Sequence, residues 1–433
     1  MTLCPPQGPT PTATPAGAGC CEEYAGLTRR GLLRAGGLAA ATGALTATFG
    51  ATTTQTAYAA TRSAPRTLVL LSLRGAADGL SLVVPHADPV YYAARPRIAV
   101  PKASLLAVDA QFGLHPSLAP LLPMWQQGKV AAVHAVGLPA PNRSHFSAME
   151  EVEDADPGSS ARVGWLNRLI GRDGWEHPLR GMHLGDAVPP TTLVGPRPTF
   201  AATSVERVEV AAAGDDDGER GQRRLRGLRT TWGGAGGPLG QGARSALGAV
   251  ADFRPARTSP EAPRGGAVYP DSDLGQALAS AARTIRADVG AEVITVDHGS
   301  WDMHTDVGNL EWGDMKNKAT DLAKSLAAFF TDLGALGDQV TVVTVSEFGR
   351  RVKENANWGL DHGHGTVMLA LGGGVKGGYV GRWPGLQNTV DADVLVTTDY
   401  RSVLAELVTT RFGASSAQVF PGFTPETVGV FRA

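Results

Sequence analysis

Five short, continuous apolar runs limit the fold of this chain more than any other feature. Each is rich in valine, leucine or isoleucine, and each is too short to be a typical helix. Runs of this kind form strands that are buried on both faces, as in the centre of a parallel sheet. The runs span Thr67–Leu73, Val130–Val136, Val293–Val296, Val340–Val345 and Val367–Leu371.

Segments with helical character separate these runs. Residues Asp314–Leu333 place apolar side chains on one stripe and end before Gly334, a common helix stop. Helices are also predicted at Leu274–Val289, which is rich in Ala, Leu and Arg, and at Pro116–Gln127, which begins with proline. The alternation predicts an α/β fold with a mostly parallel sheet covered on both faces. In such sheets, sites form outside the carboxyl ends of the strands.

The N-terminal 59 residues have the features of an export signal. A twin-arginine pattern at Thr28–Leu33 precedes a weakly apolar run at Ala35–Phe49, and Ala57–Ala59 has the small-x-small form of a cleavage site. We expect residues 1–59 to be a signal for the twin-arginine export machinery and residues 60–433 to be a secreted or periplasmic domain. The run is too short and too polar for a membrane anchor, so we expect no anchor in the mature form.

Cysteine usage and charge exclude several classes of function. Cys4, Cys20 and Cys21 all precede the predicted cleavage site, so the mature domain would have neither disulfides nor thiolate chemistry. The formal net charge is −2 and charged residues make up 18% of the chain. This balance argues against a nucleic-acid or anionic-membrane partner.

Residues 211–266 differ in composition from the rest of the chain. They contain Asp215–Asp217, an arginine-rich run at Arg220–Arg229, and repeated glycine and proline. This Gly/Arg-rich segment is predicted to be a flexible insertion. Its role stays open between a substrate lid and a disordered surface loop.

Two candidate site segments follow the first two apolar runs. Asp78 lies just beyond the first run, where a carboxylate would reach the sheet edge, although an aspartate before glycine is also typical of a turn. Ser144 precedes a predicted helix, and its hydroxyl is either a nucleophile or only a helix cap. Its neighbours Arg143 and His145 are candidates for anion binding and proton transfer.

The densest polar cluster follows the third run. Residues 297–306 contain three carboxylates and two imidazoles, with Asp297, Asp302 and His304 as candidate metal ligands. Asp302 and His304 alternate, so both point to one side of an extended segment. Aspartate with histidine suits zinc, manganese or iron, whereas carboxylates alone suit magnesium or calcium.

A fourth group of candidates lies between the last two runs. Glu347 and Arg350 follow the fourth run, and Asp361, His362 and His364 precede the fifth. The glycines between the histidines allow close folding, so these side chains can converge on one ion. Arg350 either binds an anionic substrate or forms a structural ion pair.

These segments together resemble the bacterial domain-of-unknown-function family fifteen-oh-one, whose members commonly carry twin-arginine signals. The resemblance covers nearly the whole mature chain. It rests on LRGAADGLSLVVPH, RPRIAVP, FGLHPSLAPL, SHFSAME, GWLNRL, WDMHTD, SEFGRR with EN, GLDHGHG with GGGVKGG, TDYR and VFPGF. The family is grouped by fold with alkaline phosphatases and sulfatases, which implies a doubly wound α/β fold and a divalent-metal site for phosphate or sulfate esters.

The resemblance also implies roles for individual residues. Asp78 matches the first carboxylate and Ser144 the nucleophile of the superfamily order. Asp302 with His304 matches a ligand group, to which Asp297 is a candidate addition. Glu347 stands where an aspartate is expected, and the late histidine is His362 or His364. Phe348 replaces an expected histidine ligand; Asp361 or the second histidine of DHGHG would take its place, or only one ion binds.

These observations together predict that the chain is an exported, metal-dependent hydrolase of phosphate or sulfate esters. Ser144 would attack the ester, Arg143 or Arg350 would hold the anion, and His145 would transfer a proton. Two alternatives stay open. One is a non-catalytic exported module that keeps the fold and binds a cell-surface polymer. The other is a transferase that moves a phospho-group between alcohols.

Overall fold

The computed structural model describes residues 63–209 and 218–433, all of which belong to the compact unit Ala47–Ala433. The predicted export signal and its cleavage site lie outside the described residues, as does Asp215–Asp217. No helix in the described ranges combines the length and the apolar character needed to cross a membrane.

Nine strands of the described part form one sheet, in the order β10-β4-β9-β8-β1-β7-β5-β6, with β11 paired to β4. A second, two-stranded sheet pairs β2 with β3. The strands are β1 (Thr67–Leu73), β2 (Val83–Val84), β3 (Gly113–Leu114), β4 (Val130–Gly137), β5 (Gly181–Leu184), β6 (Phe200–Ala202), β7 (Val293–His298), β8 (Val340–Val345), β9 (Thr366–Gly372), β10 (Gly378–Val380) and β11 (Thr398–Asp399).

One strand runs against the others in the large sheet. β1 pairs in parallel with β7 and β8, and β5 pairs in parallel with β6 and β7. β9 is antiparallel to both of its neighbours, β4 and β8. As a result, β9 begins at the edge where β1, β4, β7 and β8 end. Segments that precede β9 and segments that follow those four strands therefore meet at one edge.

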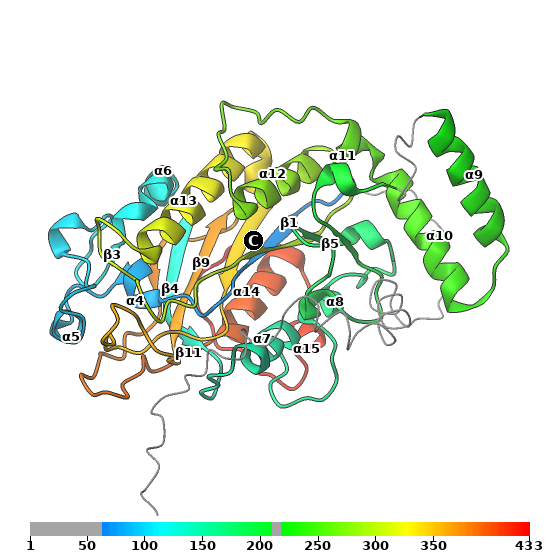
Figure 1. Cartoon of the computed structure of the whole chain (residues 1–433). Coiled ribbons are helices and arrows are strands. Elements are labelled where there is room, and N and C mark those ends of the chain that lie inside the picture. Colours follow the sequence, from blue (N-terminus) through cyan, green and yellow to red (C-terminus); the bar gives the residue numbers. More distant parts are fainter. Residues whose placement is uncertain (1–62, 210–217) are drawn as a thin grey trace, which may run out of the picture. The chain divides into compact units, whose positions relative to one another are not determined.

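Helices cover both faces of this sheet (Figure 1). The α-helices are α4 (Gly79–Leu82), α5 (Pro89–Ala94), α6 (Leu122–Gln126), α7 (His145–Asp154), α8 (Trp165–Leu169), α9 (Glu219–Gly233), α10 (Gly237–Asp252), α11 (Arg254–Thr258), α12 (Asp273–Arg286), α13 (Asp314–Leu333), α14 (Tyr400–Phe412) and α15 (Ser416–Val419). The 3₁₀ helices are η1 (Lys102–Ser104), η2 (Pro116–Leu121), η3 (Pro178–Arg180), η4 (Thr191–Leu193), η5 (Val205–Arg207) and η6 (Gly334–Gln339).

The side chains of β1 show how the two faces are buried. Val69 and Leu71 belong to the core cluster that contains α12 and α13, whereas Leu68 and Leu70 belong to the cluster that contains α7, α8 and α14. Successive side chains of a strand point to opposite faces, so a strand with a core on each side must be apolar throughout. The predicted fold class, a mostly parallel sheet with helices on both faces, is confirmed.

The segment predicted to be a flexible insertion contains regular structure. Within residues 211–266, the structure forms α9, α10 and α11. The arginines and leucines of α9 are good helix formers, and α10 provides an apolar neighbour. Gly221 is the single buried residue of α9. Composition suggested a loop because α9 is rich in arginine and glycine and has few apolar residues, a composition that is typical of exposed segments.

Candidate metal centre

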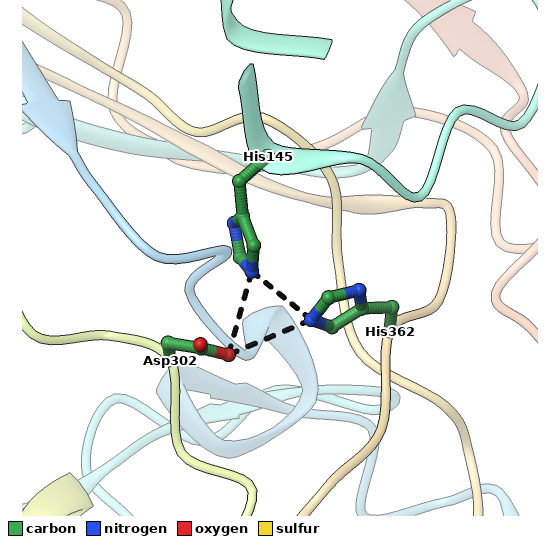
Figure 2. A group of neighbouring side chains, drawn as sticks. All are labelled: His145, Asp302 and His362. Atoms are coloured by element: carbon green, nitrogen blue, oxygen red, sulfur yellow. Dashed lines mark hydrogen bonds and ion pairs between the residues drawn. The ribbon is translucent and has the colours of Figure 1, made fainter. Parts of the chain in front are cut away.

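Three side chains from separate segments converge at the edge where β9 begins. His145 is the first residue of α7, Asp302 lies in the loop after β7, and His362 lies between β8 and β9. Their facing atoms, His145 Nε2, Asp302 Oδ1 and His362 Nε2, all lie within 4.8 Å of one another. Figure 2 shows the three side chains pointing toward a common centre.

His304 extends this group to a fourth side chain. The Nε2 atoms of His145 and His304 lie 3.0 and 2.9 Å from His362 Nε2. Asp302 Oδ1 lies 3.5 Å from His145 Nε2, 3.1 Å from His304 Nε2 and 3.6 Å from His362 Nε2. The segment follows the alternation expected of extended chain, because Asp302 and His304 share one side while Trp301 and Met303 are buried in the core.

The hydrogen bonds of His362 leave a lone pair at the centre of the group. Its Nδ1 lies 2.8 Å from the carbonyl oxygen of Arg143, which can only accept, so Nδ1 carries the proton. The neutral ring then has a lone pair on Nε2, which faces the Nε2 atoms of His145 and His304. That lone pair can accept one N–H, from His145 or from His304, or it can bind a cation. A divalent cation at the centre would use the Nε2 lone pairs of the three rings together, and a backbone contact that fixes the tautomer is typical of metal-bound histidine.

The electrostatics of the group favour a positive charge at the same place. Burial alone would lower the pKa of His145, but the carboxylates of Asp302 and Glu347 outweigh it and raise the pKa to about 9. Burial would raise the pKa of Asp302, yet the three histidines and Arg350 hold it well below its usual range. The group thus stabilises an ionised carboxylate beside an added positive charge, as a cation site requires.

Arg350 holds the Asp302 carboxylate in position through a buried ion pair. Its guanidinium is 1% exposed and donates to Asp302 Oδ1 at 2.6 Å. The remaining hydrogen bonds of this side chain go to the backbone carbonyls of Gly75, Ala76, Leu360 and Trp301. Gly75 has a φ of +107°, and a Cβ there would lie 2.5 Å from the Asp302 nitrogen, so only glycine permits this close approach. Arg350 is therefore tied to the loops that carry the ligands.

Two further carboxylates orient the histidines. Glu347 accepts from the Gly75 and Ala76 nitrogens and lies 3.5 Å from His145 Nδ1. Asp361 lies 3.2 Å from His304 Nδ1. Both contact the ring nitrogen that faces away from the centre of the group. These contacts place the two carboxylates where they can fix the orientation of the rings.

Asp78, Asp297 and His364 do not join the group. Both oxygens of Asp78 bind Arg95, at 2.6 and 2.9 Å, and one also accepts from the Ser81 nitrogen. Asp297 accepts from Arg74 Nε at 2.6 Å. His364 Nε2 lies 2.9 Å from the carbonyl oxygen of Leu138. Each was a candidate ligand, and each is engaged elsewhere in the structure.

The other predicted residues frame the group. Ser144 occupies the N-cap position of α7, directly before His145, but its side chain makes no capping hydrogen bond. Arg143 binds Asp393 through its guanidinium and His362 through its carbonyl. Phe348 is 1% exposed, and its ring centroid lies 4.9 Å from those of His145 and His362. It thus gives the group an apolar wall at a position where the family resemblance implied a ligand.

Asn355 is a contributor that the sequence did not single out. Its amide donates to the His304 carbonyl at 2.8 Å and to Asp361 Oδ1 at 3.2 Å. The only signal for it was its place in the EN segment of the family resemblance. By itself, that segment gives no reason to link Asn355 with a histidine 51 positions earlier.

Comparisons with known proteins give a family match over part of the chain and distant structural likenesses. Residues 245–416, which include Asp302 and His362, match the family model "Protein of unknown function (DUF1501)". A comparison with curated proteins gave no match. The family resemblance is therefore supported for this part of the chain.

Two similar solved structures are hydrolases. The phosphonoacetate hydrolase from Sinorhizobium meliloti 1021, solved with phosphonoacetate, shares 13% identity over 68% of this chain and 61% of its own, with a TM-score of 0.30. The phosphonate monoester hydrolase of Agrobacterium radiobacter shares 11% identity over 83% of this chain and 78% of its own, with a TM-score of 0.32. The match thus spans less than two thirds of the phosphonoacetate hydrolase. At such values neither structure assigns an activity or a residue role to this chain.

Proposed function

We propose that this chain is an exported, metal-dependent hydrolase of phosphate or sulfate esters. The observation that carries the proposal is the convergence of His145 Nε2, Asp302 Oδ1 and His362 Nε2 from three segments, with the His362 lone pair directed inward. The export part rests on the N-terminal sequence alone. The choice of ester rests on the family resemblance.

The donor set favours certain ions. Two imidazoles and one carboxylate suit zinc, manganese or iron better than magnesium or calcium, which prefer oxygen ligands. When bound, such an ion would polarise an ester oxygen and lower the pKa of a nearby hydroxyl or water. His304 lies close enough to be a fourth ligand of the ion. If it does not bind the ion, the fourth coordination position is open to a substrate.

Ser144 is the nucleophile that we propose. Its hydroxyl is not used in capping, and it adjoins His145 at the start of α7. The unpaired N–H groups at a helix start favour an anion there. The guanidinium of Arg143 is bound to Asp393, and Arg350 is committed to Asp302 and to carbonyls. We therefore assign anion binding to the ion and to the start of α7, and not to these arginines.

Metal analysis of the purified protein tests this proposal first. We expect about one divalent ion per chain in the native protein, and its loss in Asp302→Asn and His362→Gln. Asp297→Asn is the matched control, because that carboxylate lies after the same strand but binds Arg74. If no ion copurifies or rebinds, the hydrolase proposal falls.

Activity assays then separate the proposed roles. The ion-loaded protein is expected to hydrolyse p-nitrophenyl phosphate or p-nitrophenyl sulfate, and Ser144→Ala is expected to abolish turnover while the ion stays bound. Full turnover in Ser144→Ala would remove the nucleophile assignment and leave a metal-activated water in its place.

A non-catalytic binding module is the second candidate function. The observation that favours it is that both predicted anion-binding arginines are engaged internally. If His304 is a fourth ligand, four protein groups would close the ion to substrate, as in structural sites. Cobalt-substituted protein distinguishes the candidates, because phosphate or vanadate changes the visible spectrum only of an ion with an open position.

A further inference from the structure

A cavity lined by both charged and apolar groups lies at the opposite edge of the same sheet. Its volume is about 480 Å³, within the usual range for small-molecule sites. It is lined by residues that directly precede strands, including Arg66 before β1, Arg180 before β5 and Glu292 before β7. The metal-site residues lie at the edge where these strands end, so a strand length of roughly 20 Å separates the two places.

Arginines outnumber carboxylates around this cavity. The lining contains four arginines but only two carboxylates, Asp173 and Glu292. Those two carboxylates pair with Arg172 and Arg180. Within the described ranges, Arg66 and Arg411 contact no carboxylate. Among the described residues, the cavity therefore has a surplus of two positive charges.

Arg411 is buried, with 6% of its surface exposed, but its guanidinium makes only long hydrogen bonds to the described residues. Its Nε donates to Thr341 Oγ1 and its Nη2 to the Asp338 carbonyl, both at 3.3 Å. Its Nη1 makes no hydrogen bond to any residue that the structure describes. Burial and the nearby charge of Arg66 both lower the pKa of Arg411, so the pair repels itself. A buried arginine of this kind normally has an acidic partner.

The C-terminal end of α14 accepts part of the hydrogen bonds that Arg66 can donate. Its Nη1 donates to the carbonyls of Thr410 and Arg411, at 3.4 and 2.6 Å, which close the last turn of α14. Cations are commonly found at such helix ends. This contact uses one nitrogen of three, and the partial charge of a helix end does not balance two guanidinium groups.

Aromatic rings form another wall of the cavity. Arg180 lies over the Trp175 ring with 5.2 Å from Cζ to the centroid, and Arg172 lies over the Phe412 ring at 5.9 Å. Both rings line the cavity. A site of this volume is larger than a bare phosphate needs, and its apolar wall suits the organic part of a ligand.

We propose that this cavity binds a small organic anion, with a phosphate, sulfate or carboxylate group between Arg66 and Arg411 and its body against Trp175 and Phe412. The anion would supply the acceptors that these two arginines lack, as charge-assisted hydrogen bonds. The proposal does not depend on the metal centre, because the two places lie at opposite edges of the sheet.

Isothermal titration calorimetry tests the proposed anion binding in a variant that lacks a bound ion at the metal centre. Full-length Asp302→Asn protein, treated with a chelator, is titrated with phenyl phosphate, phenyl sulfate, benzoate and inorganic phosphate. We expect at least one of the three aromatic anions to bind, and more tightly than inorganic phosphate. Adding Arg411→Met or Arg66→Gln to this background should weaken that binding about tenfold or more.

A matched control removes an arginine of similar local role. Arg244 also donates to carbonyls near a helix end, those of Trp232 and Ala235, and it does not line this cavity. Arg244→Gln should leave the affinity within about twofold, and Arg66→Lys should retain most of it. The proposal is overturned if no probe binds at millimolar concentration, or if Arg66→Gln, folded by its melting temperature, binds as the background protein does.

Discussion

The two edges of the large sheet differ in the charged groups that gather there. At the edge where β1, β4, β7 and β8 end, the ligand-type atoms of His145, Asp302 and His362 lie within 4.8 Å of one another. At the edge where β1, β5 and β7 begin, the N–H groups of Arg66 and Arg411 lack acidic partners in the described ranges. The first edge gathers imidazole and carboxylate groups that can hold a cation, and the second gathers guanidinium groups that favour an anion.

Other charged residues at the first edge show why the partners of a group matter. Asp78 and Arg350 are at most 3% exposed, but their polar atoms are bound to partners that hold the loops together. Residue type and burial alone would not distinguish them from His145 or Arg411. The arrangement of the partners distinguishes candidate sites from structural ion pairs, and each prediction below tests that distinction.

The largest effect is expected for Asp78→Ala. This change leaves Arg95, which is 0% exposed, as an unpaired buried charge, so unfolding should cost about 3–5 kcal/mol less than in the native protein. Urea denaturation measures the difference. The double variant Asp78→Ala with Arg95→Met should recover part of it. Loss of bound metal with unchanged stability would show instead that Asp78 belongs to the metal centre.

A slightly smaller effect on the free energy of unfolding is expected when the pH is lowered and His115 would have to take up a proton. Burial lowers the pKa of His115 to about 4, and its Nδ1 accepts from the Ser117 nitrogen. The unfolded chain takes up this proton near pH 6.5, so the contribution to stability is present above that pH. It is lost as the pH falls toward 4 and amounts to about 3 kcal/mol.

Denaturation across pH 4 to 7 measures this term, as the difference between the native protein and His115→Asn. Asparagine can keep the accepting contact at the start of η2 but does not titrate. The native protein should lose more stability than the variant as the pH falls. Equal pH slopes in both proteins would remove His115 as the cause.

An intermediate effect on the metal centre is expected for Asp361→Ala. The Asp361 carboxylate lies against the outer nitrogen of His304, so its loss should weaken metal binding about 10- to 100-fold without abolishing it. Competition with a fluorescent chelator measures the affinity. Glu311→Ala is the control, because that carboxylate is exposed farther along the loop that carries Asp302. An unchanged affinity in Asp361→Ala would show that His304 is not a ligand.

The smallest effect is expected for Asp297→Asn. Its partner is Arg74, and the two side chains are 34% and 28% exposed, so the pair should contribute about 1 kcal/mol or less. Arg74 also keeps its contact with Glu153. Denaturation and metal analysis of the variant should both be close to native. Loss of the ion in Asp297→Asn would break the comparison, because a residue paired elsewhere would then be a ligand.

The regular structure was largely predictable, and the reason is local. β1, β8 and α13 have the predicted bounds, because a continuous apolar run or a one-sided apolar stripe is a property of neighbouring residues. The helices within residues 211–266 were not predicted, since α9 keeps its arginines in solvent and has few apolar residues. Its charged and glycine-rich composition is typical of a loop, so composition alone did not indicate a helix.

The candidate site was predictable in part. The sequence located Asp302, His304 and His362 by the density of ligand-type side chains near strand ends. It considered His145 for proton transfer, whereas the structure places that ring among the candidate ligands. It also gave Asp78 and Arg350 direct roles, because no local pattern reveals that Arg95 binds one and that carbonyls bind the other.

The amino-acid sequence by itself determined the α/β class and the positions of most strands, because apolar periodicity records burial residue by residue. Only the tertiary structure decided which polar residues meet. The direction of β9 is the clearest case: in a fully parallel sheet, His362 would lie at the edge opposite Asp302. The antiparallel pairing of β9 with β8 and β4 brings them together. Strand direction depends on pairing between distant segments, which no local pattern encodes.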